Sequence, residues 1–360
     1  MPSYRVVTPQ RTYDAVIERG ILSRAGEFVP PSAGRVFVVT TEDVWRLHGH
    51  LLEAGLSGRN ATPLFFPGGE ERKRMAQVEA LAEQMVEAGG DRTSMIIAFG
   101  GGIVNDLGGF LAAIFMRGIP VLQIPTTLLS QVDAAVGGKT GANLTSGKNL
   151  VGAFHQPLAV LIDPTVLETL SDREYRAGLY EIIKGGVIRD ASLFEIFERQ
   201  REAVLRRDPA IVDTIIAAKV RIKAEVVTND EREGDLRRIL NFGHTIGHAL
   251  ESETRYARFL HGEAVAFGMN AATRLAITAV GLPHEIAERI ISVVDSYGPI
   301  PSLAGVEASN LARRLASDKK TLQGKVHFVL PTAIGEVKIV SGVPEEKVLA
   351  AIEESLQVAV

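Results

Sequence analysis

A change of hydrophobic pattern near the middle of the chain constrains its fold more than any other feature. In the first half, short β-branched runs that read as strands alternate with amphipathic segments. These runs lie at 35–41, 62–66, 94–99, 120–124 and 159–162. Between the second and third runs, residues 70–88 carry apolar side chains at helical spacing. This alternation predicts a mostly parallel sheet covered by helices, an α/β architecture.

From Ser171 onward, helical periodicity replaces that alternation. The expected helices lie near 174–187, 192–206, 209–228, 242–254, 262–279 and 283–296. Only residues 325–340, with Gly335 at the turn, resemble a late hairpin. Because 360 residues exceed what one hydrophobic core normally serves, we expect an α/β domain at 1–168 followed by an all-α domain at 169–360.

Composition narrows the classes of function. The formal net charge of −4 offers no global field that would attract nucleic acid or an anionic membrane. The absence of cysteine excludes disulfides and thiolate metal sites, so any metal must be bound by His and carboxylate ligands. The longest apolar stretches, such as 107–116, fall short of the ~20 residues that a membrane span needs. The first residues do not read as a signal peptide, so we expect a cytoplasmic protein.

A glycine-rich turn follows the expected strand at 94–99. In Gly100-Gly101-Gly102, the glycines would let backbone amides approach a pyrophosphate, and the following helix N-terminus adds partial positive charge. This turn predicts a dinucleotide site, although it differs from the usual GxGxxG pattern; a plain tight connection is the alternative. Asp43 after the first strand, and Glu70 with Lys73 after the second, could contact the same nucleotide or be ordinary caps and solvated residues.

Three of the eight histidines fall within eighteen positions. His244 and His248 are four residues apart and would share a helix face, and His261 could turn back towards them from the next helix. Imidazoles with one carboxylate suit zinc or cobalt with an open position for a substrate oxygen. The spacing leaves open whether His244 and His248 both bind metal, and helix caps or hydrogen-bonded core histidines are the alternative.

Cationic and polar residues stand among glycines in a third constellation. Arg117 precedes Gly118, Lys139 follows a glycine pair, and Lys148-Asn149 follows Gly147. Such residues neutralise phosphate or carboxylate groups, which favours a small acidic substrate over a solvated surface loop. Lys184, three residues after Glu181, could share a helix face with it, or form only a local ion pair.

Taken together, these motifs resemble the 3-dehydroquinate synthases of the shikimate pathway, in the sugar phosphate cyclase family. The matching motifs keep the family's order from about residue 4 to residue 330. They are Gly100 to Asp106, Met116-Arg117-Gly118, Pro125 to Leu129, Gln131-Val132-Asp133, Gly137 to Thr140, Gly147-Lys148-Asn149, Glu181 to Lys184, Leu240 to His248, His261 to Ala264 and Asp318-Lys319-Lys320.

The resemblance implies a Rossmann-like NAD-binding domain, a helical metal-binding domain and a cleft between them. It implies that Glu181, His244 and His261 bind zinc or cobalt, so that His248 becomes a substrate contact. The implied substrate-site residues are Lys139, Lys148, Asn149, Lys184, Lys223, Arg237, Asn241 and His248, with Asp133 nearby and one of Lys319 and Lys320 pointing inward. The implied NAD contacts are Asp43, Glu70, Lys73, Gly101, Gly102, Asp106, Thr126, Thr127 and Thr169, with Lys139 and Lys148 also at the cofactor. Arg117 would reach the phosphate in a neighbouring subunit, which implies a homodimer.

The implied enzyme is a phosphate-eliminating carbon–oxygen lyase that converts 3-deoxy-D-arabino-heptulosonate 7-phosphate into 3-dehydroquinate. The implied reaction begins with transient oxidation by NAD and continues with β-elimination, return of the hydride and aldol closure. Because the hydride is returned, NAD is recycled. The alternatives are a related cyclase of sedoheptulose 7-phosphate or glucose 6-phosphate, a metal-dependent polyol dehydrogenase and a non-catalytic nucleotide-binding protein. Arg237 and Asn241 stand where the synthases contact the substrate carboxylate, which favours the synthase.

Three positions depart from the commonest family pattern. Asn105 replaces a usual glycine, Tyr180 a usual small residue, and Gly185 an aromatic residue or histidine. These departures leave the implied metal ligands intact.

Overall fold

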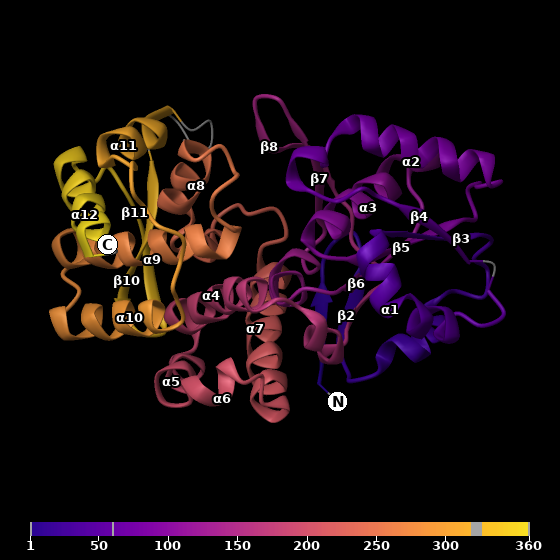
Figure 1. Ribbon diagram of the computed structural model, residues 1–360, viewed down its shortest axis with the longest axis horizontal. Coiled ribbons are helices and arrows are strands. Elements are labelled where there is room, and N and C mark those ends of the chain that lie inside the picture. The colour runs from indigo at the N-terminus through magenta and orange to yellow at the C-terminus, as the bar shows by residue number, and fades with distance from the viewer. Residues whose placement is uncertain (1, 60, 318–325, 359–360) are drawn as a thin grey trace. The chain divides into compact units, whose positions relative to one another are not determined.

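The computed structural model describes residues 2–59, 61–317 and 326–358, in two compact units (Figure 1). Unit 1 comprises Met1–Ser171 and Lys223–Arg232, and unit 2 comprises Asp172–Ile222 and Glu233–Val360. The boundary expected after residue 168 therefore differs from this division, since one later segment returns to unit 1. There the backbone amide of Val7 donates to Thr228 Oγ1 at 3.1 Å, a contact 221 positions apart in the chain that no local pattern encodes.

The core of unit 1 is a seven-stranded sheet with the order β1-β2-β9-β6-β5-β3-β4. Strands β1 and β2 pair antiparallel, and the other neighbouring pairs are parallel. The bounds are β1 (Ser3–Val7), β2 (Thr12–Ile17), β3 (Val36–Thr40), β4 (Ala61–Phe65), β5 (Met95–Gly100), β6 (Val121–Pro125) and β9 (Ala159–Ile162). The five expected strands are thus confirmed as β3, β4, β5, β6 and β9, whereas the β1–β2 hairpin was not anticipated.

Helices cover both faces of this sheet (Figure 1). On one face, η1 (Ile21–Phe28) and α1 (Glu42–Gly55) pack against Val36, Val38 and Ile97. On the other face, α2 (Met75–Glu87) and α3 (Gly102–Ile114) pack against Phe37, Val39 and Ile96. Because β3 and β5 are buried on both faces, they read as continuous apolar runs, which is why the sequence revealed them. The helix expected at 70–88 begins only at Met75, after a 3-10 turn, η2 (Glu70–Arg72).

The strand order reverses between β3 and β5. The chain leaves β3 for β4 on one side, and then crosses to β5 on the other side of β3. The loops that follow β3 and β5 therefore diverge, and the carboxyl ends of these strands form the position where open α/β sheets bind ligands. Asp43 follows β3, and the glycine turn follows β5.

A two-stranded sheet packs beside α3. Strands β7 (Lys139–Leu144) and β8 (Gly147–Phe154) pair antiparallel, with an irregularity between Ala142 and Leu144. The glycine-rich constellation that could have been a surface loop is thus an ordered hairpin, and Ala142 belongs to the apolar core beneath α2 and α3. The short elements η3 (Phe115–Arg117), η4 (Ser130–Ala134) and η5 (Pro164–Thr169) complete this part of unit 1.

Unit 2 is built mainly of helices, which confirms the expected change of architecture. They are α4 (Asp172–Arg189), α5 (Ala191–Arg199), α6 (Arg201–Leu205), α7 (Pro209–Asn229, ending in unit 1), η6 (Leu236–Asn241), α8 (His244–Glu253), α9 (His261–Val280), α10 (His284–Ser296), α11 (Ala308–Ser317) and α12 (Glu345–Val358). The late hairpin is confirmed as β10 (His327–Ala333) and β11 (Glu336–Ser341), whereas α11 and α12 were not anticipated.

Helix α9 occupies the middle of unit 2 and packs against α4, α8, α10 and α12. Glycine makes two of these contacts close. A Cβ on Gly262 would lie 1.9 Å from the carbonyl oxygen of Ala177 on α4, and a Cβ on Gly268 would lie 1.9 Å from that of Gly243 before α8. The missing side chains therefore let α4, α8 and α9 approach one another at the level of the histidines. No helix within the described ranges has the length and apolarity to cross a membrane.

Candidate active site

Three histidines and one carboxylate converge in unit 2. Oε1 of Glu181 on α4 lies 3.7 Å from Nε2 of His244 on α8 and 3.9 Å from Nε2 of His261 at the start of α9. His248 follows His244 by one turn, and the ligand atoms of the three histidines all lie within 4.8 Å of one another. The structure therefore brings together both the ligand set implied by the family motifs and the histidine pair suggested by spacing.

Hydrogen bonds determine which imidazole nitrogens can act as ligands. Nδ1 of His261 lies 3.2 Å from Oε2 of Glu251, and Nδ1 of His244 lies 3.3 Å from the carbonyl oxygen of Phe242. Because an ionised carboxylate and a carbonyl only accept, both Nδ1 atoms carry the proton. The Nε2 lone pairs of both rings are then available for a metal, and these are the atoms near Glu181 Oε1.

The environment of Glu181 supports the same arrangement. Its side chain is 0% exposed, and its Oε2 lies 2.5 Å from Lys184 Nζ. Within the described part of the chain, Oε1 accepts no hydrogen bond. A buried carboxylate oxygen without a donor is costly, and a cation would satisfy it. Tetrahedral zinc with ligands at its usual distances separates them by about 3.4 Å. The observed 3.7 and 3.9 Å fit a divalent cation after a small adjustment.

Glu251 orients this cluster and was missed by the sequence reasoning. It is 2% exposed, and its Oε2 lies near both His261 Nδ1 and His248 Nε2, at 3.2 and 3.9 Å. Burial alone would lower the pKa of His261, but the Glu251 and Glu181 carboxylates raise it above its usual value. The sequence signal for Glu251 was its spacing. It follows His244 by seven residues and His248 by three, which places it on the same face of the helix.

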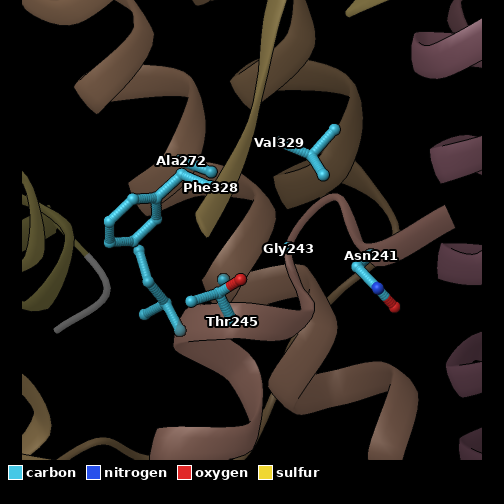
Figure 2. Close-up of a pocket in the computed structure, with 8 residues that line it drawn as sticks. Asn241, Gly243, Thr245, Ala272, Phe328 and Val329 are labelled. Atoms are coloured by element: carbon cyan, nitrogen blue, oxygen red, sulfur yellow. The ribbon is translucent and has the colours of Figure 1, made fainter. Parts of the chain in front are cut away.

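Arg237 and Asn241 lie on η6, the turn before α8. Arg237 is 2% exposed, and Asn241 Nδ2 donates to Glu233 Oε1 at 2.8 Å. Asn241 also lines a small pocket beneath β10, with Phe328 across from it (Figure 2). The other lining residues are Gly243, Thr245, Ile246, Gly268, Ala272 and Val329. Lys319 and Lys320 lie outside the described residues.

In unit 1, the implied nucleotide contacts follow the carboxyl ends of the parallel strands. A Cβ on Gly101 would lie 3.1 Å from Thr127 Cγ2, and one on Gly102 would lie 3.2 Å from Ala134 Cβ. A side chain at either position would therefore be tightly packed, and Thr127 or Ala134 would have to shift to accept it. Thr127 and Ser130 exchange hydrogen bonds, including 2.9 Å between their hydroxyl oxygens, which shapes the loop after β6. Asp43 lies in the first turn of α1 after β3, Thr126 directly follows β6, and Thr169 is the last residue of η5 after β9.

A second ionic cluster in unit 1 surrounds Lys73. Its Nζ pairs with the Asp106 carboxylate on α3 and donates to Asn149 Oδ1 on β8 at 2.6 Å. Lys73 is 2% exposed, so its charge needs this partner. Burial raises the pKa of the Asp106 carboxyl, and the Lys73 ammonium opposes that shift. This cluster joins two implied cofactor residues to one implied substrate residue.

Lys223 and Asp133 form a neighbouring pair. Lys223 Nζ donates to Asp133 Oδ1 at 2.6 Å and to the Asp133 carbonyl oxygen. Asp133 lies in η4, a single π-helical turn, a distortion that often occurs at functional sites. Lys223 begins the segment that returns to unit 1, so the pair accounts for part of that return.

The remaining sequence-predicted residues lie at the surface. Lys139 at the start of β7 and Arg117 on η3 are exposed, and Lys148 on β8 is half-buried. Arg117 has φ 68 and follows Met116 with φ 50, so this short turn is held in a left-handed conformation. Among the described contacts, Arg117 belongs neither to the Lys73 cluster nor to the histidine cluster of unit 2.

The three departures from the family pattern all lie at buried positions. Asn105 is buried and its Nδ2 donates to the Ala98 carbonyl oxygen on β5 at 3.1 Å. Tyr180 is buried, with its pKa raised by that burial. A Cβ on Gly185 would lie 2.8 Å from Lys219 Cδ, so the stem of a buried lysine occupies space beside that glycine.

Fold and site together define a class of proteins. Its members have a parallel α/β sheet of the kind that binds dinucleotides and a helical unit that carries a histidine–carboxylate cluster. A 2-epi-5-epi-valiolone synthase from Streptomyces hygroscopicus, solved with NAD⁺ and Zn²⁺ bound, has a TM-score of 0.87 at 30% identity over 98% of both chains. A 2-deoxy-scyllo-inosose synthase, solved with carbaglucose-6-phosphate, NAD⁺ and Co²⁺, has a TM-score of 0.89 at 25% identity, over 98% of this chain and 99% of that one.

Sequence comparisons specify the family within this class. The model for the N-terminal part of 3-dehydroquinate synthase matches residues 63–177, and that for its C-terminal part matches residues 178–321. A 3-dehydroquinate synthase of Solibacter usitatus is 62% identical over 99% of this chain and 100% of its own length. The chain belongs to the 3-dehydroquinate synthase family, which confirms the resemblance seen in its motifs.

Proposed function

We propose that this protein converts 3-deoxy-D-arabino-heptulosonate 7-phosphate into 3-dehydroquinate and phosphate. The observation that carries the proposal is the buried Glu181 oxygen beside the Nε2 atoms of His244 and His261, in a chain of this family. The activity requires two cofactors, NAD and a divalent metal.

We assign the metal, zinc or cobalt, to Glu181, His244 and His261. When bound there, such a cation polarises a substrate hydroxyl and stabilises negative charge that develops on its oxygen. Glu251 and the Phe242 carbonyl hold the protons on the Nδ1 atoms, so the two rings present Nε2. Lys184 holds an ammonium proton beside Glu181 Oε2 and leaves Oε1 to the cation.

We assign NAD to the loops at the carboxyl ends of β3, β4, β5, β6 and β9. NAD bound there would supply a reversible hydride acceptor, so the reaction would form no net NADH. Gly101 and Gly102 allow close approach of the pyrophosphate to the N-terminus of α3. The Asp43 carboxylate accepts hydrogen bonds from the ribose hydroxyls. The loop after β4 is ordered by contacts of Glu70 and by the ion pair between Lys73 and Asp106. Thr126, Thr127 and Thr169 complete the contacts.

The substrate carries a phosphate and a carboxylate, and the proposed contacts match that charge. Lysines and arginine at positions 139, 148, 184, 223 and 237 bind its anionic groups, while Asn149 and Asn241 orient its hydroxyls. Asp133 holds Lys223 Nζ in place. His248, beside the buried Glu251 carboxylate, moves a proton to or from a substrate hydroxyl through its imidazole nitrogen.

We further propose that the protein acts as a cytoplasmic homodimer in which Arg117 of one protomer contacts the phosphate bound by its partner. The exposed position of Arg117 and its left-handed backbone conformation support a contact with a neighbouring protomer. A related sugar phosphate cyclase is the second candidate, favoured by the TM-scores of 0.87 and 0.89. The buried Arg237, on the same short helix η6 as Asn241, favours a substrate with a carboxylate.

The test is incubation of the metal-loaded protein with the heptulosonate phosphate and catalytic NAD, followed by NMR. We expect equal amounts of phosphate and carbocycle, without accumulation of NADH at 340 nm. Sedoheptulose 7-phosphate and glucose 6-phosphate serve as parallel substrates. Turnover of either one in preference to the heptulosonate phosphate, or net NADH, would overturn the proposal.

A further inference from the structure

Asn143 is a buried amide that no motif singled out. It is 6% exposed and lies at the irregularity of β7, where the ladder with β8 shifts register. Such a bulge turns a residue out of the regular pairing of its strand. Here the backbone of Asn143 pairs instead with the loop after β4: its N–H donates to the Lys73 carbonyl oxygen at 2.7 Å.

Every hydrogen-bonding group of the Asn143 side chain has a partner. Nδ2 donates to Glu70 Oε1 at 2.7 Å and to the Glu70 carbonyl oxygen at 3.1 Å. Oδ1 accepts from the backbone N–H of Asn149 at 2.8 Å. A single amide thus connects the loop with Glu70 and Lys73 to the β-strand with Asn149.

Asn149 needs such support, because its backbone has φ 53, a conformation that residues other than glycine rarely adopt. Its side chain is held from the other side, since Lys73 Nζ donates to Asn149 Oδ1 at 2.6 Å. The contacts of Asn143 and Lys73 together determine where the Asn149 amide points.

We propose that Asn143 is a positioning residue that couples the Glu70–Lys73 loop to Asn149, so that NAD binding at the loop orders a substrate contact. The inference rests on the proposed function for the identity of the two ligands. Asn143 supplies two donors and one acceptor at once, which aspartate, serine and alanine cannot do. Its role is to hold Asn149 and Glu70, and it touches neither ligand itself.

The test compares Asn143→Ala with Asn229→Ala, an exposed control in unit 1 whose amide, among the described residues, donates to the Glu225 carbonyl oxygen of its own helix. Asn143→Ala should raise the NAD dissociation constant and the KM for the heptulosonate phosphate each by about tenfold, as expected for lost hydrogen bonds to functional groups. The control should change neither. Hydrogen–deuterium exchange of residues 143–149 should slow on NAD addition in the parent protein but not in Asn143→Ala.

A second background isolates the coupling. Asn149→Gly tolerates the positive φ without help, so adding Asn143→Ala to it should leave the KM unchanged within about twofold. If Asn143→Ala does not fold, Asn143→Asp is used, which keeps the acceptor for Asn149 but loses both donors to Glu70. Asn143→Asp should weaken NAD binding more than it raises the KM for the heptulosonate phosphate.

Three results would overturn the inference. They are a fall in melting temperature with normal NAD affinity and KM, additive effects of the two substitutions on KM, or NAD protection of residues 143–149 that survives in Asn143→Ala. The exchange and NAD-binding measurements need no turnover, so inactivity of the parent protein towards the heptulosonate phosphate would contradict only the proposed function.

Discussion

Nζ of Lys184 lies 2.5 Å from Oε2 of Glu181, three residues earlier on the same face of α4. Both side chains are 1% exposed or less, so neither charge can be solvated by water if its partner is lost. The same carboxylate offers its other oxygen to two imidazoles. The buried Glu181 carboxylate thus contacts a lysine on its own helix through one oxygen. Through the other oxygen it faces a candidate cation site formed with histidines of α8 and α9.

Replacing Lys184 separates these roles. Without metal, Lys184→Met leaves the Glu181 carboxylate buried and unpaired, which should destabilise the metal-free protein by about 3 kcal/mol. With metal bound, the carboxylate regains a positive partner and most of that loss should disappear. Denaturant unfolding with and without zinc measures the difference, and Lys347→Met on α12 is the control. Equal destabilisation in both states would contradict this prediction.

Glu251 should control metal affinity without touching the metal. Glu251→Ala removes the acceptor that keeps the proton on His261 Nδ1, and loss of such a partner typically weakens metal binding about 10–100-fold. Glu251→Gln keeps an oxygen acceptor and should lose less. Competition with a chelator measures the affinity. The control is Glu253→Gln, on the same helix as Glu251, which removes the charge that pairs with Arg314 on α11. Unchanged affinity in Glu251→Ala would show that His261 needs no orienting group.

Stability should fall in acid partly through His48. Burial, with a smaller effect of the charge on His50, lowers the pKa of His48, whose Nε2 lies 2.8 Å from Thr169 Oγ1. The unfolded chain therefore takes up a proton more readily than the folded one. The contribution of neutral His48 to stability is present above the pKa of this histidine in the unfolded chain, near 6.5. It is lost as the pH falls through the lower pKa that His48 has in the folded protein.

The measurement is the free energy of unfolding between pH 7.5 and pH 5, with metal held constant. His48→Gln should lose less stability over this range than the parent protein, because glutamine does not titrate. His284→Gln, at the exposed start of α10, should follow the parent curve. If the slopes of His48→Gln and the parent coincide, the shift assigned to His48 is wrong.

Close approach of α9 to α4 should be necessary for the histidine cluster. Gly262→Ala would place a Cβ 1.9 Å from the Ala177 carbonyl oxygen, so the helices must separate next to His261. We expect a loss of about 1–3 kcal/mol of stability, as for other overpacked sites, together with weaker zinc binding. Gly268→Ala strains the contact further along α9 and should destabilise the protein with a smaller effect on zinc affinity. Normal zinc affinity in Gly262→Ala would refute this dependence.

Much of the architecture could be predicted from local pattern. Buried parallel strands are continuous apolar runs and helices repeat every 3.6 residues, so β3, β5 and the helices from α4 to α10 were visible in the sequence. The β1–β2 hairpin was missed because an edge strand such as Ser3–Val7 buries little of its surface. The hairpin at 139–154 was missed because its glycines resemble those of a loop.

Residue chemistry and spacing predicted a metal site without cysteine, a glycine turn after β5 and two histidines on one helix face, whereas the resemblance to the family supplied Glu181 as the carboxylate ligand. Only the tertiary structure decided which nitrogens face Glu181, that Glu251 and Asn143 hold their neighbours in place, and that Lys223–Arg232 returns to unit 1. The physical reason is range. Periodicity and capping act over a few residues, whereas these contacts join segments brought together by packing of the cores, and glycines such as Gly262 set their separation.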